Sequence, residues 1–279
     1  QGAPTGVHYP CVAKPAMLSA SRGVIRCDSP GELSRALKRI HSLLYSEGKL
    51  GEDVVLVEDY IDGLEYAVDG LLKRGRLQVL AIFEKPDPMA GPFFEETIYL
   101  TPPRLSHKVT GQLIGALENL CRKLGICEGA LHAELRINSS GVWFLEIAGR
   151  TVGGRCGRIL EFQTGCSLEE LVLANAVRLP AAVGESTGSS GVMMIPVTQG
   201  GVLRRVEGIS AARREPGIID VEIDAREGQI LVPWPEGCAY PGFIFARAGT
   251  VADVERALRA AHRCLNFVLA PQLPTTTAL

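Results

Sequence analysis

Glu134 and Glu146 are the residues with the clearest chemical potential, and they flank a predicted β-hairpin. The small residues Ser139–Gly141 are typical of a three-residue hairpin loop, in which glycine supplies the left-handed backbone conformation. A loop of that length sets a register that pairs Asn138 with Val142, Arg136 with Phe144 and Glu134 with Glu146. Strand alternation then places one apolar set on the other face, namely Ala133, Leu135, Ile137, Trp143, Leu145 and Ile147. The sequence therefore predicts two carboxylates directly opposite each other.

Two opposed carboxylates need a compensating charge. Directly opposed residues have Cβ atoms about 4.5–5.5 Å apart, and like charges there destabilise a sheet. Mg²⁺ prefers carboxylates together with substrate phosphates and would compensate both, with Mn²⁺ as an alternative. The other interpretation is that each glutamate pairs with Arg136 or Arg150 on a solvated sheet face. The hairpin alone leaves both interpretations open.

The segments that must position this hairpin mix strands and helices. Period-2 apolar patterns predict strands at 9–14, 54–57, 65–72, 77–83, 129–137, 142–148, 192–197, 218–223 and 243–246. Helical spacing and Ser caps predict helices at 33–44, 106–124, after 167, and at 251–265. Because the order is not strictly β–α–β, the mixture favours an α+β fold.

The polar stretch Glu185–Gly191 is the clearest internal boundary. It divides the chain into three expected units at 1–61, 62–190 and 191–279, the last with a β/α extension and a loose tail. The first strand arrives almost at once, and the chain does not start with methionine. We therefore expect a fragment whose upstream domain is missing.

Composition excludes several functional classes. The 279 residues are 46% hydrophobic and carry a net charge of −2, which is typical of a globular protein and argues against a nucleic-acid partner. No apolar run approaches the roughly 20 residues that span a bilayer, so no membrane segment is expected. The eight cysteines form no C-x-x-C pair, which favours reduced thiols and a cytoplasmic location over a disulfide scaffold or structural zinc.

The order of the polar motifs carries a resemblance to a known family. Lys14 comes first, followed by the loop Ser19–Gly23, the segment Glu58–Ile61, Glu65, and then Glu134 and Glu146–Arg150. This order resembles the ATP-grasp superfamily, and most closely its branch of biotin-carboxylase-like enzymes and bacterial L-amino-acid ligases. The resemblance covers residues 9–180 in detail and extends loosely to about 270. It implies two lobes that clasp ATP, a small αβ lobe and a larger antiparallel mixed sheet.

The resemblance implies that the N-terminal motifs hold the phosphates of ATP. Lys14 would contact them as a point charge. The loop would fold over them with backbone N–H groups and hydroxyls, through Ser19, Ala20, Ser21, Arg22 and Gly23. Taken alone, Lys14 would be a solvated residue at a strand end and the loop a simple turn. The loop also departs from the glycine-rich pattern of many relatives, because Ala20 stands where glycine is common.

The remaining motifs would bind the nucleoside and the metal. By resemblance, backbone groups near Tyr60 and Ile61 contact the adenine edge with help from Glu58, and Glu65 accepts hydrogen bonds from the ribose. Glu65 alone would be a charged residue on an outward strand face. Glu134 and Glu146 would bind Mg²⁺, and the catalytic Arg150 would bind a transferring phosphoryl group or a substrate carboxylate.

Three further residues carry weaker signals. Ala148 stands where many relatives have a metal-binding asparagine, which favours one metal site over two. Lys85 is placed in the loop before Gly91, where a solvated lysine is favoured over one that contacts phosphates. His132 shares a predicted face with the glutamates, as either a catalytic residue or a structural one bonded to a backbone carbonyl.

The implied function is an ATP-dependent carboxylate–amine ligase that forms an amide or peptide bond through an acylphosphate. Its cofactors would be ATP and Mg²⁺, and its partners a small carboxylate, a small amine and the missing N-terminal domain, with a homodimer left open. Two alternatives remain, a biotin-carboxylase-like carboxylase and a nucleotide-binding module without catalysis.

Overall fold

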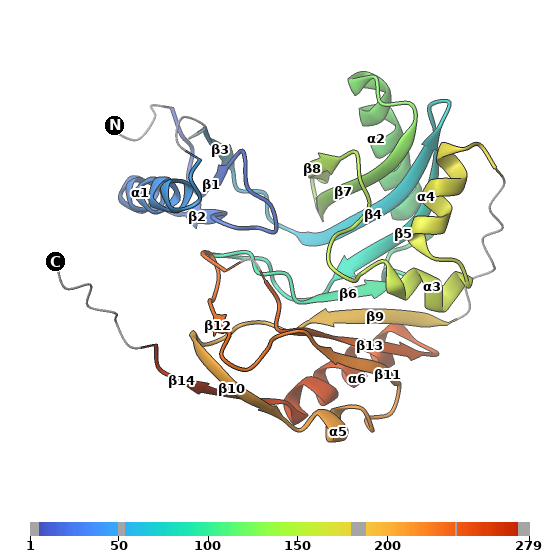
Figure 1. The fold of residues 1–279 in the computed structure, drawn as a ribbon. Coiled ribbons are helices and arrows are strands. Elements are labelled where there is room, and N and C mark those ends of the chain that lie inside the picture. Colours follow the sequence, from blue (N-terminus) through green and yellow to red (C-terminus); the bar gives the residue numbers. More distant parts are fainter. Residues whose placement is uncertain (1–5, 50–53, 180–187, 238, 273–279) are drawn as a thin grey trace.

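The computed structural model describes residues 6–49, 54–179, 188–237 and 239–272. Over these residues the chain forms three antiparallel sheets with six helices, so the expected α+β class is confirmed (Figure 1). The boundary expected at Glu185–Gly191 lies partly outside the described residues, and β9 (Ser189–Met194) begins within it. No helix among the described residues is long and apolar enough to cross a membrane. The three-unit division itself stays a prediction.

A small N-terminal unit combines three strands with one long helix. The strands are β1 (Cys11–Pro15), β2 (Ile25–Cys27) and β3 (Val55–Asp59), with β1 in the centre. Helix α1 (Pro30–Ser46) is capped by the preceding Ser29, whose hydroxyl accepts the Glu32 N–H. Leu33, Ile40 and Leu44 pack at helical spacing against the buried face of β1 and β2. This unit therefore has a core of its own.

An eight-stranded antiparallel sheet occupies the centre of the molecule (Figure 1). Its strands lie in the order β11 (Ile218–Ile223), β13 (Gly242–Ala248), β9, β6 (Ile98–Thr101), β5 (Arg76–Lys85), β4 (Leu64–Lys73), β7 (Gly129–Asn138) and β8 (Gly141–Ala148). Strands from both halves of the chain thus share one sheet, because β6 pairs with β9.

Both faces of this sheet are covered, which explains the continuous apolar runs in its central strands. Val192, Met194, Phe243 and Phe245 point to one face, where α3 (Arg158–Thr164) and α4 (Leu168–Ala176) contribute to the core. Their neighbours in sequence point to the other face, where they pack on α6 (Val251–Cys264). The same alternation in β4 and β7 buries residues under α2 (His107–Leu124).

A third, small sheet lies beside the larger one. It consists of β12 (Ile230–Leu231), β10 (Gly201–Glu207) and β14 (Asn266–Ala270), and the short helix α5 (Ile209–Ala212) follows β10. In Figure 1 this sheet lies on the same side of the molecule as the N-terminal unit. A segment that follows β12, residues 232–237, contacts that unit.

The β7–β8 hairpin pairs Glu134 with Glu146 as predicted, but through a different register. The loop has two residues, so Asn138 pairs with Gly141 and Arg136 with Trp143. A register shift after Glu134 then skips one residue of β8 and restores the predicted pair. As a result, Val142 and Phe144 join the apolar face in place of Trp143 and Leu145. The predicted apolar face was therefore wrong at these positions.

Candidate functional site

One cavity of about 860 Å³ lies between the N-terminal unit and the large sheet. Its lining contains nearly all the residues predicted to bind ATP or metal: Lys14, Ser19, Ala20, Ser21, Arg22, Glu58, Tyr60, Ile61, Glu65, Glu134, Glu146 and Arg150. Gly23 is the exception, because it is buried at the end of the loop against Pro15 and Leu43. Residues more than 130 positions apart in sequence thus meet at one surface.

Lys14 lies in the wall that the N-terminal unit contributes. It is partly buried, with its Nζ 2.6 Å from a carboxylate oxygen of Glu58 and 3.3 Å from the carbonyl oxygen of Leu145. Glu58 is its diagonal neighbour on β3, since Glu58 pairs with Val12 and Lys14 pairs with Leu56. Lys14 is therefore held in the cavity wall rather than free in solvent.

The predicted phosphate loop forms a tight turn between β1 and β2. Ala20 and Ser21 both have positive φ, at 58° and 54°, in the left-handed region that non-glycine residues rarely adopt. Ala20, which stands where many relatives carry glycine, thus has a backbone conformation that favours glycine. The loop is held within the chain by the bonds from Arg22 N–H to Ser19 O and from Val24 N–H to Ser21 O.

The predicted hinge already uses part of its backbone hydrogen-bonding capacity. The Tyr60 N–H donates to Pro10 O at 3.0 Å, and Ile61 O accepts from Arg136. Arg136 also donates to Glu65 at 3.0 Å and to Met89 O at 2.7 Å, and its guanidinium lies over the Tyr60 ring. Arg136 therefore joins the hinge to the sheet.

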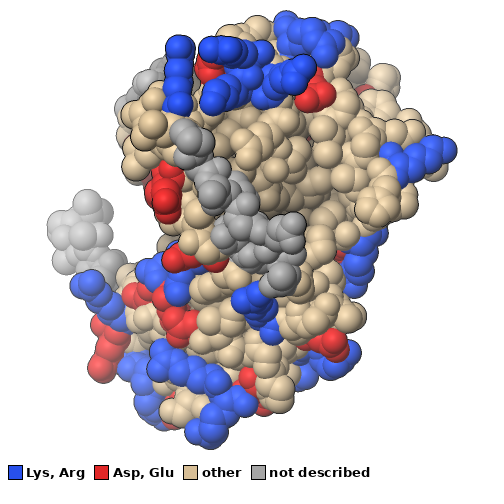
Figure 2. All heavy atoms as spheres, turned by 90° about the vertical axis from the view of Figure 1, so that its right-hand side faces the viewer, with Lys and Arg blue, Asp and Glu red and all other residues tan. Residues whose placement is uncertain are grey.

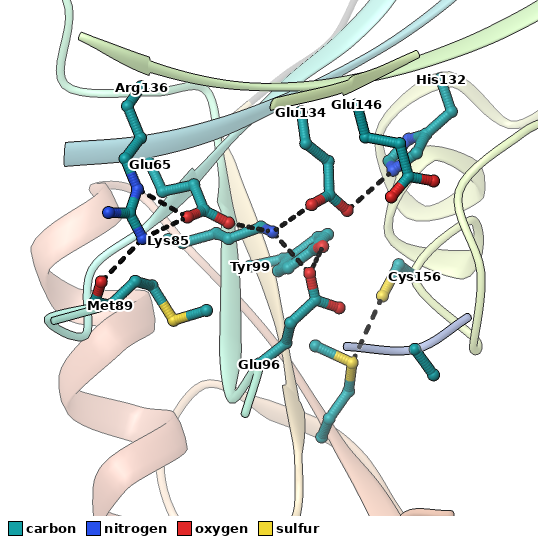
Figure 3. Close-up of polar contacts among 12 residues, drawn as sticks. Glu65, Lys85, Met89, Glu96, Tyr99, His132, Glu134, Arg136, Glu146 and Cys156 are labelled. Atoms are coloured by element: carbon teal, nitrogen blue, oxygen red, sulfur yellow. Dashed lines mark hydrogen bonds and ion pairs between the residues drawn. The ribbon is translucent and has the colours of Figure 1, made fainter. Parts of the chain in front are cut away.

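Lys85 is the residue that the sequence analysis placed wrongly. It is the last residue of β5 rather than part of a loop, and only 3% of its side chain is exposed. Its ammonium donates to Glu65 at 2.7 Å and to Glu96, and lies 3.4 Å from Glu134 (Figure 3). The expectation of a solvated lysine fails because β5 continues to Lys85, opposite Glu65 on β4.

The charges around Lys85 stabilise one another. Burial alone would lower the pKa of Lys85, but Glu134, Glu65 and Glu96 outweigh it and raise that pKa well above its usual value. Burial would raise the pKa of Glu134, yet Lys85 and His132 lower it strongly. For Glu96 burial dominates, and its pKa is raised. Lys85 is thus a protonated cation among carboxylates.

His132 belongs to a second buried chain of polar groups. Its Nδ1 lies 2.9 Å from Asp69 Oδ1. Its Nε2 lies 3.3 Å from Glu134, as Figure 3 shows. Asp69 is fully buried and also accepts the Val152 N–H. It therefore joins the His132 imidazole to the loop that follows Arg150. Burial lowers the pKa of His132, but these two carboxylates raise it to about 9. The partner of His132 is therefore a carboxylate and not a backbone carbonyl.

Glu146 and Arg150 are the more exposed members of the site. The Glu146 side chain is 58% exposed, and its nearest cationic contact is Arg150 at 3.9 Å. Arg136, the other partner considered, is engaged with Glu65. Glu146 thus retains oxygens that face the cavity and can accept a ligand.

The donor set fits a magnesium ion. Glu134 and Glu146 occupy opposed register positions, both line the cavity, and both offer only oxygen atoms, which suits Mg²⁺ or Mn²⁺. A second cluster consists of carboxylate oxygens that all lie within 4.8 Å of one another, from Glu65, Glu96 and Glu134. Lys85 compensates that group, of which Glu134 is also a member, whereas Glu146 lies outside it and is 58% exposed. The hairpin pair is therefore the better position for an added cation, because Glu146 supplies oxygens that Lys85 does not contact.

Sequence reasoning missed Lys85, Glu96 and Asp69 as members of this site. A signal was present for Asp69, because it interrupts the apolar strand Leu64–Lys73. A charged residue within such a run must have a buried partner, and His132 on the paired strand provides it. Glu96 gave no such signal, since it lies in an irregular segment before β6.

The geometry defines the class: a small unit closes a charged cavity against a large antiparallel sheet. The chain belongs to the ATP-grasp family, since the family model described as "ATP-grasp domain" matches residues 7–159, more than half of the chain. A second model, "L-amino acid ligase C-terminal domain 2", matches residues 193–270. The resemblance inferred from the motifs is confirmed.

Individual relatives support this assignment. The crystal structure of an L-amino acid ligase from Bacillus licheniformis superposes with a TM-score of 0.82 and 26% identity, covering 95% of this chain and 65% of that one. Dapdiamide A synthase of Enterobacter agglomerans is 29% identical over 178 residues, 62% of this chain and 40% of that protein. An uncharacterized protein of Sinorhizobium fredii is 24% identical over 270 residues, 95% of this chain and 54% of that protein. The chain thus spans about half the length of these curated relatives.

Proposed function

We propose that this chain is the ATP- and metal-binding part of a ligase that joins a small carboxylate to an amine. The observation that carries the proposal is the pairing of Glu134 with Glu146 in the cavity that also contains Lys14 and the hinge. The match of residues 193–270 to an L-amino acid ligase domain favours this function over a carboxylase.

Each wall of the cavity has a part in this proposal. The Tyr60 carbonyl and the Ile61 N–H would contact the purine edge. The Tyr60 N–H and the Ile61 carbonyl already have hydrogen-bond partners within the chain. Lys14 and the loop Ser19–Arg22 would hold the phosphates. Glu134 and Glu146 would hold Mg²⁺, which offsets the negative charge of the phosphates when bound. The division into units 1–61, 62–190 and 191–279 is part of the same proposal.

The reaction would proceed in two transfers. A carboxylate oxygen of the substrate attacks the γ-phosphorus of ATP, and ADP leaves as the acylphosphate forms. An amine then attacks the acyl carbon and displaces phosphate, so one amide bond forms for each ATP. Arg150, exposed at the cavity edge next to Glu146, would hold the substrate carboxylate or the phosphoryl oxygens.

The test is a screen of the full-length protein for phosphate release from Mg·ATP with amino acids, singly and in pairs. We expect release that requires an amino acid, and its loss in Glu134→Gln and in Glu146→Gln with unchanged circular dichroism. Release driven by bicarbonate instead would identify a carboxylase. Binding of Mg·ATP without release under any of these conditions would identify a non-catalytic module.

A further inference from the structure

Residues Pro233–Gly237, here called the latch segment, contact the predicted phosphate loop from the C-terminal part of the chain. The Trp234 Nε1 donates to Ala20 O at 3.1 Å, and the Gly23 N–H donates to Pro235 O at 3.0 Å. Arg22 Nε adds a third bond, to Glu236 O at 2.9 Å. Three hydrogen bonds thus join three residues of the latch segment to one short loop more than 200 positions earlier.

An ion pair extends the same contact to helix α1. Both carboxylate oxygens of Glu236 accept from the Arg39 guanidinium, at 2.9 Å for Nη2, in the bidentate arrangement that favours arginine. This bond lowers the pKa of Glu236, since it outweighs the effect of burial. The latch segment therefore holds the loop and the helix of the N-terminal unit together.

The latch segment has a fixed shape of its own. Its ends are joined by the bond from Gly237 N–H to Pro233 O at 2.9 Å, and a Cβ at Gly237 would lie 2.0 Å from Val232 O. Trp234 is buried and stacks on Tyr240 with ring centroids 4.9 Å apart. Tyr240 lines the cavity beside Met194 and Cys156, so the latch segment is continuous with the cavity wall.

The phosphate loop needs such external support. Two successive non-glycine residues, Ala20 and Ser21, hold left-handed conformations that persist only where surrounding contacts impose them. The Ala20 carbonyl accepts the Trp234 indole N–H, and the bonds at Arg22 and Gly23 follow within three residues. The latch segment thus binds the strained part of the loop.

We propose that the latch segment fastens the phosphate loop over the nucleotide, with Trp234 and Glu236 as positioning residues, and that its release precedes nucleotide exchange. The inference rests on the proposed nucleotide binding at this loop. The Arg39 and Glu236 side chains are 46% and 41% exposed, and an ion pair this accessible is weak and sensitive to salt. It can therefore open without unfolding either unit.

The chain offers a reporter for the latch. It has two tryptophans, of which Trp143 is 43% exposed and Trp234 is buried, so a Trp143→Phe background leaves Trp234 as the only indole. In that background, Glu236→Gln should raise the acrylamide quenching constant of Trp234 without nucleotide, by about twofold or more. A fluorescent ADP analogue should also dissociate about two- to fivefold faster, which is the range expected for one exposed ion pair.

Glu227→Gln is the matched control, because Glu227 is an exposed glutamate of the same C-terminal region. The double variant Arg39→Glu/Glu236→Arg reverses the ion pair. It should return the quenching constant and the dissociation rate toward the values of the Trp143→Phe background, whereas a purely structural defect would not be restored. Quenching and dissociation equal to those of the Glu227 control would overturn the latch. Failure of the analogue to bind any variant would reject the proposed nucleotide site, while the quenching would still decide whether the latch opens.

Discussion

Lys85 is a buried cation surrounded by three carboxylates. It ends β5 opposite Glu65 and lies within ion-pair distance of Glu65, Glu96 and Glu134. Three carboxylates at this depth would repel one another without it. Lys85 therefore fixes where Glu134 points, and through Glu134 it orients one of the two proposed metal ligands.

Replacing Lys85 by methionine should destabilise the protein strongly. The change retains most of the side-chain volume but leaves buried carboxylates without their cation, at a cost of about 3–5 kcal/mol in the free energy of unfolding. Urea unfolding followed by circular dichroism measures it. Lys73→Met, at the exposed end of β4, should change stability by less than about 0.5 kcal/mol. Similar small losses for both variants would show that Lys85 does not hold the cluster together.

Single residues were predictable where their role follows from local spacing. The pairing of Glu134 with Glu146 followed from a short turn, and both carboxylates do line one cavity. Lys85 was not predictable, because its burial depends on strand pairings such as Glu65 with Lys85, 20 residues apart, and Ala67 with Glu134, 67 residues apart. A lysine before Pro86 looks like a loop residue in sequence.

At the scale of elements, the hairpin shows how a correct pairing can rest on a wrong loop. The sequence favoured three loop residues, and the structure has two loop residues and a register shift that skips one residue of β8. Either route brings Glu134 opposite Glu146, but only the observed one packs Phe144 against the core and exposes Trp143. Helices were easier to predict, because their caps and period are local: Ser29, Ser106 and Ser167 each cap the helix expected there.

Two glycines should respond in opposite directions to substitution by alanine. Gly63 precedes β4 at the hinge with φ 114°, and a Cβ there would lie 2.4 Å from Ile137 O. Gly115 lies in α2 with open space around it. Gly63→Ala should therefore cost at least about 1–3 kcal/mol, whereas Gly115→Ala should stabilise by about 0.5–1 kcal/mol. Chemical denaturation measures both, and equal signs would contradict the account of the hinge.

His262 on α6 should make stability depend on pH. Burial and the nearby charges of Arg259 and Arg263 lower its pKa below the value of 6.5 expected when unfolded. The unfolded chain therefore takes up this proton first, so the stabilisation is complete above about pH 6.5 and is lost as the pH falls through the lower folded-state pKa. His262→Gln should flatten the plot of unfolding free energy against pH in this range. The substitution His107→Gln, at an exposed histidine, should leave that plot unchanged. Identical slopes for wild type and His262→Gln would reject the assignment.

At the scale of the whole molecule, the order of strands in the large sheet was beyond the sequence analysis. Seven of its eight strands were predicted, but β6 was not. The contact between β6 and β9 joins Ile98 to Met193. No local pattern specifies a pairing over that separation, because it depends on which edges remain after the helices have packed. The face shown in Figure 2 carries both basic and acidic side chains.

The central claim is that Glu134 and Glu146 hold a magnesium ion that binds the nucleotide phosphates. Calorimetric titration of the 279-residue chain with ATP, with and without Mg²⁺, tests it most directly. We predict that Mg²⁺ tightens ATP binding to the wild type and to Glu227→Gln alike. In Glu134→Gln and Glu146→Gln the increase in ATP affinity caused by Mg²⁺ should be at least about tenfold smaller. Even residues that only hydrogen-bond to metal ligands change metal affinity by that factor when they are mutated. Equal Mg²⁺-dependent gains in the wild type and both variants would contradict the account.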